Sequence, residues 1–151
     1  MIKTQLNSDD VFEVLKLGKM LHQESRFRTS PFNDDKVLHL FGLTLKYPDR
    51  VFIAYDSEFK GFILMSIQED YFSDTKYAAD FCLYIKPEYR GGLLVKRLVG
   101  EAEKWALNNG AYEVRLGHTT GIKTDTAPRL FDKLGYEPTG YLFKKELNNV
   151  R

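Results

Sequence analysis

The stretch 80–98 has the residue types and spacing with which a chain holds a phosphate group. An aromatic and β-branched run at 81–85 predicts a buried strand, a proline ends it, and Gly91 and Gly92 allow a tight turn. Apolar residues at helical spacing follow and predict a helix. The first amides of a helix lack intrahelical partners and lie at the positive end of its dipole. The stretch therefore predicts an anion site, such as one for a pyrophosphate, with Arg90 adding positive charge.

These residues resemble a signature of the GNAT superfamily of acetyl-CoA-dependent N-acetyltransferases. In that family the strand usually reads LYVxPxYRG, and residues 83–91 here read LYIKPEYRG. The family's phosphate signature is Gln or Arg, two residues, Gly, one residue, then Gly or Ala. Arg90 fits the first place, whereas Leu93 and Val95 stand where small residues belong. We expect these side chains to hold the cofactor further from the backbone, with partial compensation from Gly92, which lies one place early.

A second motif follows downstream in the family's order. Residues 127–136 read APRLFDKLGY and resemble the signature AxxLYEKLGF. The resemblance covers residues 76–147, whereas the amino-terminal half fits only in its order of elements. It implies an α/β fold of the α+β type: a central mixed, mostly antiparallel sheet of about six to seven strands, flanked by about four helices. It also implies that a homodimer is among the expected states.

The resemblance implies direct transfer of an acetyl group from acetyl-CoA to an amine, without a covalent enzyme intermediate. The backbone of Leu83, Tyr84 and Ile85 would hold the pantetheine arm. The pyrophosphate would lie against the chain from Arg90 to Val95, and Thr124 and Phe131 stand at positions that face the cofactor in the family. The full set of expected cofactor-binding residues is Leu83, Tyr84, Ile85, Arg90, Gly91, Gly92, Leu93, Leu94, Val95, Thr124 and Phe131.

The reaction needs a base that takes a proton from the amine. Family members often carry a carboxylate near the start of the cofactor strand, which makes Asp80 the leading candidate here. Glu69 or Asp70 on the preceding strand is the alternative, and a solvated charge at a strand edge is an equally open interpretation of Asp80.

The usual acid is missing, because Phe131 replaces the tyrosine that commonly protonates the thiolate in the family. Tyr136 and Tyr141 are the nearest substitutes, and a packing role is the alternative for each. A coenzyme A thiolate is also a tolerable leaving group without an acid. Thr124 replaces a common cofactor-facing Asn with a shorter hydroxyl side chain.

Two segments are candidates for acceptor binding. Glu24 and Arg26 lie between the first two predicted helices, in the region that forms the acceptor pocket in related folds, and their mixed charge suggests an acceptor with amine and acidic groups. His118 follows the strand that should flank the cleft. The alternatives are a solvated loop and a capping histidine. The expected acceptor is a primary amine on a small molecule or peptide.

Composition limits the other functions. At 151 residues, with 43% hydrophobic residues and a net charge of +1, the sequence predicts one globular domain over 1–151 and no nucleic-acid partner. Cys82 is the only cysteine and falls in a predicted buried strand, which favours a packing role over a nucleophile. No metal-ligand spacing appears, so no metal is expected. No apolar stretch is long enough for a membrane helix and no signal peptide opens the chain, so the default expectation is a cytoplasmic protein.

Hydrophobic periodicity places the elements in the order β-α-α-β-β-β-α-β-α-β. The expected strands are 2–6, 51–55, 61–67, 77–85, 112–117 and 141–147, and the expected helices are 9–24, 34–47, 92–109 and 124–134. Two other functions stay open. Phe131, Leu93 and Val95 favour a binding module of the same fold that lacks turnover. The other function is transfer to an amine on a charged tRNA, and the near-neutral net charge disfavours it.

Overall fold

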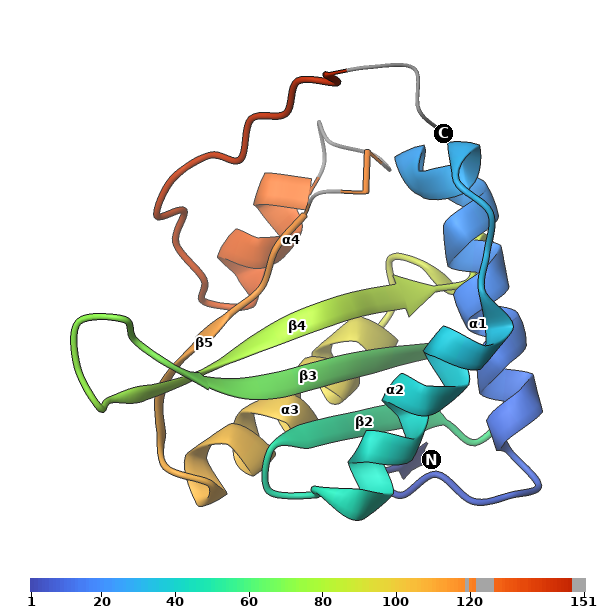
Figure 1. The fold of residues 1–151 in the computed structure, drawn as a ribbon, viewed down its shortest axis with the longest axis horizontal. Coiled ribbons are helices and arrows are strands. Elements are labelled where there is room, and N and C mark those ends of the chain that lie inside the picture. The colour runs from blue at the N-terminus through green and yellow to red at the C-terminus, as the bar shows by residue number, and fades with distance from the viewer. Residues whose placement is uncertain (119, 122–126, 148–151) are drawn as a thin grey trace.

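The computed structural model describes residues 1–118, 120–121 and 127–147. Four α-helices and five strands follow one another in nearly the expected order (Figure 1). The strands are β1 (Ile2–Lys3), β2 (Val51–Asp56), β3 (Gly61–Glu69), β4 (Lys76–Ile85) and β5 (Ala111–Arg115). The helices are α1 (Val11–Glu24), α2 (Asp34–Lys46), α3 (Leu94–Asn108) and α4 (Ala127–Lys133), with short 3-10 turns at Arg26–Thr29 and Pro87–Tyr89.

The five strands form one sheet in the order β1-β2-β3-β4-β5. The first four pair antiparallel, because short connections join β2 to β3 and β3 to β4. Only β5 runs parallel to its neighbour β4, and helix α3 makes the crossover between them. The mixed, mostly antiparallel sheet expected from the resemblance is confirmed, and the described residues contribute five strands to it rather than six or seven.

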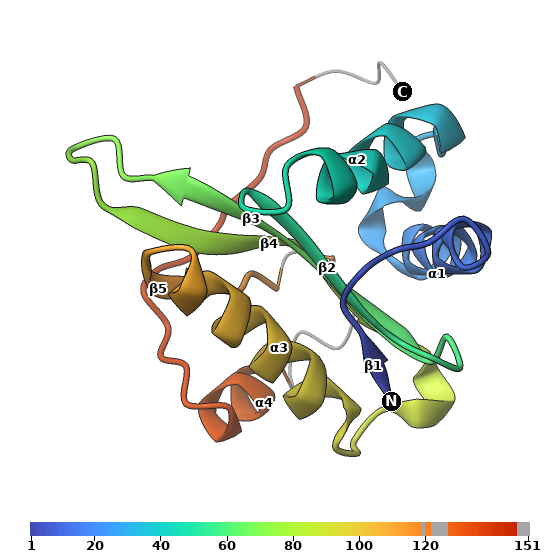
Figure 2. The same cartoon turned by 90° about the horizontal axis from the view of Figure 1, so that it is seen from below.

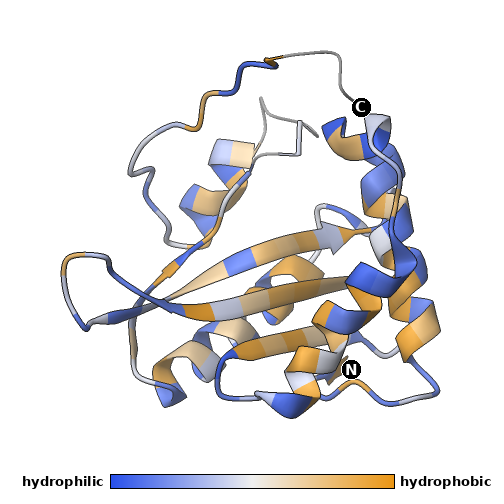
Figure 3. Cartoon of the chain, viewed as in Figure 1, coloured by the Kyte–Doolittle hydropathy of each residue, from blue (hydrophilic) through white to orange (hydrophobic). Residues whose placement is uncertain are grey.

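Helices cover both faces of the sheet (Figure 2). Helices α1 and α2 pack on one face around Phe41, Ile53 and Leu64, whereas α3 packs on the other around Met65 and Leu98. All six residues of β2 are buried, because alternate side chains enter the two cores. The hydropathy colouring follows this arrangement, with apolar central strands and polar outer helix surfaces (Figure 3).

The expected final strand at 141–147 is wrong for the described chain, since this segment pairs with no described strand. Tyr141, Leu142, Phe143 and Leu147 are all exposed. The first expected strand is also shorter than predicted and ends at Lys3. A strand needs a paired neighbour as well as a suitable pattern, and the sequence signal reports only the pattern.

Candidate active site

The candidate site begins where β4 and β5 separate. Their parallel pairing joins Lys76 to Ala111, Ala78 to Val114 and Ala79 to Arg115, and then stops. From residue 80 to 85, β4 keeps its partner β3 on one side but has no described strand on the other. Backbone donors and acceptors on that side, which pair with no described strand, can bind a ligand, except for the Ile85 carbonyl, which accepts from Arg90.

A β-bulge marks the point of separation. On β3, Leu64 and Met65 are neighbours, but on β4 they oppose Cys82 and Asp80, so Phe81 is an extra residue. A bulge bends its strand and increases the local twist. The bulge lies just beyond Ala79, the last residue of β4 that pairs with β5. No sequence pattern predicted this bulge.

Asp80 lies beside the bulge, one residue past the last pair between β4 and β5. Its Oδ1 atom accepts a hydrogen bond of 2.9 Å from the backbone N–H of Gly117, just after β5. Burial raises the pKa of the Asp80 carboxyl, and backbone N–H groups, that of Gly117 foremost, partly oppose the rise. A half-buried carboxyl with a raised pKa is a stronger base than an exposed aspartate.

The turn between β4 and α3 has the backbone that an anion site needs. Gly91 adopts a φ of 87°, a conformation that favours glycine. No side chain caps the start of α3, whose first residue is Leu94. The amides of its first turn therefore remain available to an anion. A Cβ atom at Gly92 would lie 4.0 Å from the carbonyl oxygen of Tyr89, an ordinary contact, so packing does not require this glycine.

The two large residues in the phosphate signature do not crowd the turn equally. Val95 is 8% exposed and packs in the core between α3 and the sheet, so its side chain points away from the turn. Leu93 is 65% exposed at the N-cap of α3. Of the two, Leu93 alone exposes its side chain beside the amides.

Arg90 does not stand free to meet a phosphate. Its Nη1 and Nη2 atoms donate to the two carboxylate oxygens of Glu24 at 2.7 and 2.9 Å, and its Nε donates to the carbonyl of Ile85 at 2.8 Å. The hydroxyl of Tyr84 also donates to Glu24, at 3.0 Å. Burial and this bond raise the pKa of Tyr84 to about 12. The hydrogen-bonded group of Glu24, Tyr84 and Arg90 joins the end of α1 to the end of β4.

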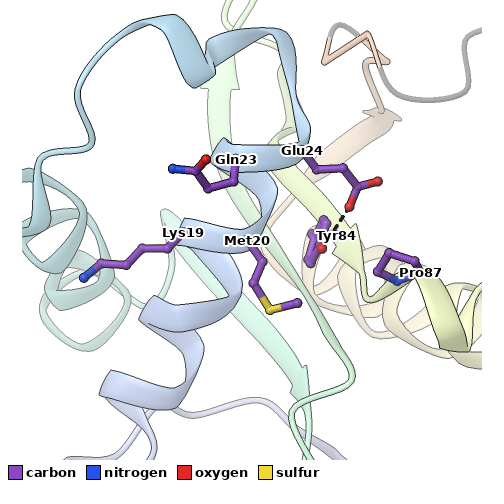
Figure 4. Close-up of a pocket in the computed structure, with 6 residues that line it drawn as sticks. All are labelled: Lys19, Met20, Gln23, Glu24, Tyr84 and Pro87. Carbon is purple, nitrogen blue, oxygen red and sulfur yellow. Dashed lines mark hydrogen bonds between the residues drawn. The ribbon is translucent and has the colours of Figure 1, made fainter.

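An open pocket lies beside this group, between α1 and the end of β4 (Figure 4). Glu24 and Tyr84, joined by their hydrogen bond, line it together with Pro87. The remaining lining residues, all from α1, are Lys19, Met20 and Gln23. Because the Glu24 carboxylate already accepts three hydrogen bonds, its first role in the structure is to bind Arg90.

The structure brings Phe131, Tyr136 and His118 together. The Phe131 ring lies edge-on to His118 at 6.4 Å and to Tyr136 at 6.5 Å. The Tyr136 hydroxyl donates to Glu103 of α3 at 2.8 Å. Burial, then this bond, raises the pKa of Tyr136. Tyr141 is 88% exposed and lies apart from these rings, and Thr124 lies outside the described residues.

The two expected acceptor segments meet at the backbone. The N–H of Arg26 donates to the carbonyl of Thr120 at 2.7 Å, which joins the turn after α1 to the loop after β5. His118 Nε2 is shielded from solvent and has no hydrogen-bond partner among the described residues. A buried, unpartnered nitrogen is available to a ligand.

The alternative bases lie elsewhere. Asp70 accepts from the side chains of Thr75, Tyr112 and Arg115, and the bonds from Tyr112 and Arg115 are the main cause that lowers the pKa of its carboxyl. Glu69 is exposed at the end of β3. Sequence reasoning missed the Gly117 amide and Glu103, because only the fold brings them to Asp80 and Tyr136.

Comparison with known proteins agrees with this geometry. Residues 17–136 match the model of the Acetyltransferase (GNAT) family. The match covers more than half of the chain, so the chain is a member of the GNAT acetyltransferase family. A comparison with curated proteins found no match.

Several solved structures share the fold. An aminoglycoside N-acetyltransferase, AAC(6')-Iy, in complex with a bisubstrate analogue is 20% identical, with a TM-score of 0.75 over 98% of this chain and 99% of that one. Glucosamine-6-phosphate N-acetyltransferase from Arabidopsis thaliana is 16% identical, with a TM-score of 0.73 over 98% and 99%. An aminoglycoside acetyltransferase from an uncultured soil metagenomic sample, in complex with trehalose, is 16% identical, with a TM-score of 0.73 over 98% and 96%.

Proposed function

We propose that this protein is an N-acetyltransferase that moves an acetyl group from acetyl-CoA to a primary amine of a small molecule or peptide. The observation that carries the proposal is the open side of β4 leading directly into the uncapped start of α3. One element offers backbone hydrogen bonds to an extended arm, and the next offers amides to a pyrophosphate. The order matches the order of these groups in coenzyme A.

The described residues fit this co-substrate. Leu83, Tyr84 and Ile85 lie on the open part of β4, where their backbone would hold the pantetheine arm. The pyrophosphate would lie on the amides that follow Gly91, because no side chain competes for them. The thioester of acetyl-CoA supplies an activated acetyl group. Thr124 remains an expected contact outside the described residues.

Asp80 is the proposed base. Its raised pKa and its place where β4 and β5 separate suit a group that takes the amine proton directly or through water. The Gly117 N–H fixes the orientation of the Asp80 carboxylate through its Oδ1 atom.

The acid is the less constrained part of the proposal. Tyr136 packs against Phe131, but its hydroxyl proton is directed to Glu103. Tyr141 is exposed on the segment after α4. Departure of the thiolate without protonation by the protein is therefore the simplest course, with Tyr136 as the candidate acid if one acts.

The acceptor is proposed to enter between the turn after α1 and the loop after β5. Arg26 and His118 lie on these two segments, and Glu24 lies at the end of α1 beside them. Structures of the same fold include enzymes named for aminoglycosides and for glucosamine 6-phosphate, both of which carry primary amines on sugars. An amino sugar is accordingly the first acceptor class to test.

A second candidate function is a module that binds acetyl-CoA without turnover. Phe131 favours it, since the residue has no proton to give, and so does the Tyr136–Glu103 bond. Release of coenzyme A thiol separates the two functions. We expect release from acetyl-CoA with at least one acceptor among amino sugars, aminoglycosides, polyamines, amino acids and peptides. Binding of acetyl-CoA without release across this screen would favour the module.

A further inference from the structure

The Arg90 side chain joins the turn before α3 to two other elements. Its Nη1 and Nη2 atoms donate to both carboxylate oxygens of Glu24, and its Nε atom donates to the carbonyl oxygen of Ile85. The donors of a guanidinium lie in a fixed plane, so three such bonds determine both the position and the orientation of the group. Arg90 therefore links the chain directly before Gly91 to the end of α1 and the end of β4.

The acceptor of this contact is itself held in place. Glu24 is the last residue of α1, a helix whose buried side chains pack in the core against the sheet. Its carboxylate also accepts from the Tyr84 hydroxyl of β4 at 3.0 Å (Figure 4). Solvent reaches the ion pair only in part, so its bonds keep more of their strength than those of an exposed pair. A guanidinium bound to this carboxylate is thus bound to the body of the molecule.

The turn that follows has few contacts to fix it. In the part of the chain that the structure describes, the N–H groups of Gly91 and Gly92 make no hydrogen bond. A Cβ atom at Gly91 would meet nothing within 4 Å, and no side chain caps α3. Glycine is also the residue with the greatest conformational freedom to lose. The direction of these amides therefore depends on what holds the chain at either end, which is Arg90 before the turn and α3 after it.

We propose that Arg90 is a positioning residue for acetyl-CoA rather than a ligand of its phosphates. Held by Glu24 and Ile85, it keeps the backbone of the turn in the conformation that receives the pyrophosphate. The inference rests on the proposed function and adds Glu24, 66 positions away in the sequence, to the residues that determine the affinity for acetyl-CoA. The competing role is that Glu24 restrains Arg90 in the free protein and the phosphates replace it on binding. The two roles give opposite signs for one substitution.

Calorimetric titration of Glu24→Gln with acetyl-CoA measures that sign. If Arg90 positions the turn, loss of the carboxylate frees the turn, and the dissociation constant should rise about tenfold, since ordering one backbone residue on binding costs about that factor. If Arg90 is a phosphate ligand, removal of its competitor should lower the dissociation constant. An unchanged or lower constant would overturn the inference alone, whereas a wild-type chain that does not bind acetyl-CoA would overturn the proposed function as well.

Arg90→Lys separates the charge of the side chain from its geometry. Lysine keeps the positive charge but lacks the planar fork that binds Glu24 and Ile85 together. The dissociation constant should rise by a similar factor. Glu24→Gln combined with Arg90→Lys should weaken binding no more than the stronger single substitution, because both remove one restraint. Full affinity in Arg90→Lys, or additive losses in the combined variant, would overturn the positioning role.

Two controls test loss of charge and loss of stability separately. Glu88→Gln removes an exposed negative charge beside the turn and should not weaken binding. Tyr55→Phe breaks the bond to Asp10 that joins the start of α1 to β2, away from the turn. It should lower the midpoint of thermal unfolding and leave the dissociation constant unchanged. Weakened binding in Tyr55→Phe would trace the effect to stability and overturn the positioning role.

NMR order parameters report the proposed cause directly. In the free protein, those of the Gly91 and Gly92 amides should fall in Glu24→Gln and in Arg90→Lys, but not in Tyr55→Phe. A more mobile turn together with weaker binding is the result that supports positioning. Weaker binding with unchanged order parameters would overturn it.

Discussion

The raised pKa and the burial of Asp80 follow from its position, where β5 separates from β4. The bulge at Phe81 ends the parallel pairing just beyond Ala79, so the carboxyl is half buried and accepts the Gly117 N–H instead of meeting bulk water. Its pKa is raised because burial disfavours the charged form more than the hydrogen bonds favour it. The raised pKa makes Asp80 a stronger base, but the ionised carboxyl in this half-buried place lowers the free energy of unfolding.

The substitution Asp80→Asn tests the catalytic effect and the stability effect separately. Turnover should fall on the order of 10²-fold or more, which is the usual contribution of a general base, while affinity for acetyl-CoA is retained. In the folded state the carboxyl binds a proton at a pH where the unfolded chain has released it, so the free energy of unfolding falls as pH rises from the ordinary value of 3.8 through the raised pKa. The variant removes this penalty and should unfold at neutral pH with equal or higher free energy.

Steady-state rates and urea unfolding measure both effects. The wild-type rate should decline as pH falls through the raised pKa of Asp80, and the variant should lose that inflection. Asp49→Asn, at an exposed turn position, is the control. A variant with full turnover would remove Asp80 from the mechanism.

The Glu24–Arg90 ion pair is the second contact whose contribution a single substitution can measure. The two side chains are 66 positions apart and are 29% and 21% exposed, so water screens them only in part. Glu24→Gln should lower the free energy of unfolding by about 1–3 kcal/mol, because a partly buried guanidinium loses its charged partner. The matched control is Glu13→Gln, which breaks an exposed pair with Lys16 and should cost about 0.5 kcal/mol or less. Equal costs in the two variants would mean that the Glu24–Arg90 pair is a surface contact without structural weight.

At the scale of elements, β3 and β4 must approach closely where the cofactor strand ends. A Cβ atom at Gly61 would lie 2.7 Å from the carbonyl oxygen of Tyr84. Gly61→Ala should therefore destabilise the protein by about 1–3 kcal/mol, the usual cost of overpacking, and should weaken acetyl-CoA binding by moving Tyr84 and Ile85. Gly42→Ala in α2 meets no atom within 4 Å and should stabilise by about 0.5–1 kcal/mol. Thermal unfolding compares them, and a stable Gly61→Ala would contradict the close approach.

The sequence predicted the elements well where periodicity reports burial. The apolar spacing in α1 to α3 and the apolar runs in β2 to β4 placed these elements within a few residues of their observed bounds. The sequence-based prediction failed where the structure depends on pairing with another segment of the chain. The bulge at Phe81 comes from register against β3, and the segment 141–147 has strand character without a described neighbour.

The candidate site divides in the same way. The motifs marked the turn at Gly91 and the start of α3, because the chemistry there is backbone chemistry set by local conformation. They misjudged Val95, whose side chain turns into the core. They also paired neither Glu24 with Arg90 nor Tyr136 with Glu103, since such contacts form only when distant elements pack.

At the scale of the whole molecule, charge limits the partners. The net charge is +1, and in the described part of the chain no helix has the length and apolar composition to cross a membrane. A protein that neutralised many phosphates would need a cationic excess. We therefore expect no retention of tRNA in filter binding at physiological salt. Tight binding that weakens steeply with added salt would instead favour transfer to a charged tRNA.

Calorimetric titration with acetyl-CoA tests the central claim, that the β4 edge and the start of α3 form the cofactor site. The wild-type chain should bind one acetyl-CoA. Gly92→Asp should bind none while remaining folded, because a Cβ atom there makes only an ordinary contact with the Tyr89 carbonyl at 4.0 Å, and the new carboxylate repels the pyrophosphate at the start of α3. Gly42→Asp, on α2, should bind as the wild type does. Absence of binding to the wild type, or equal binding to Gly92→Asp, would contradict the account.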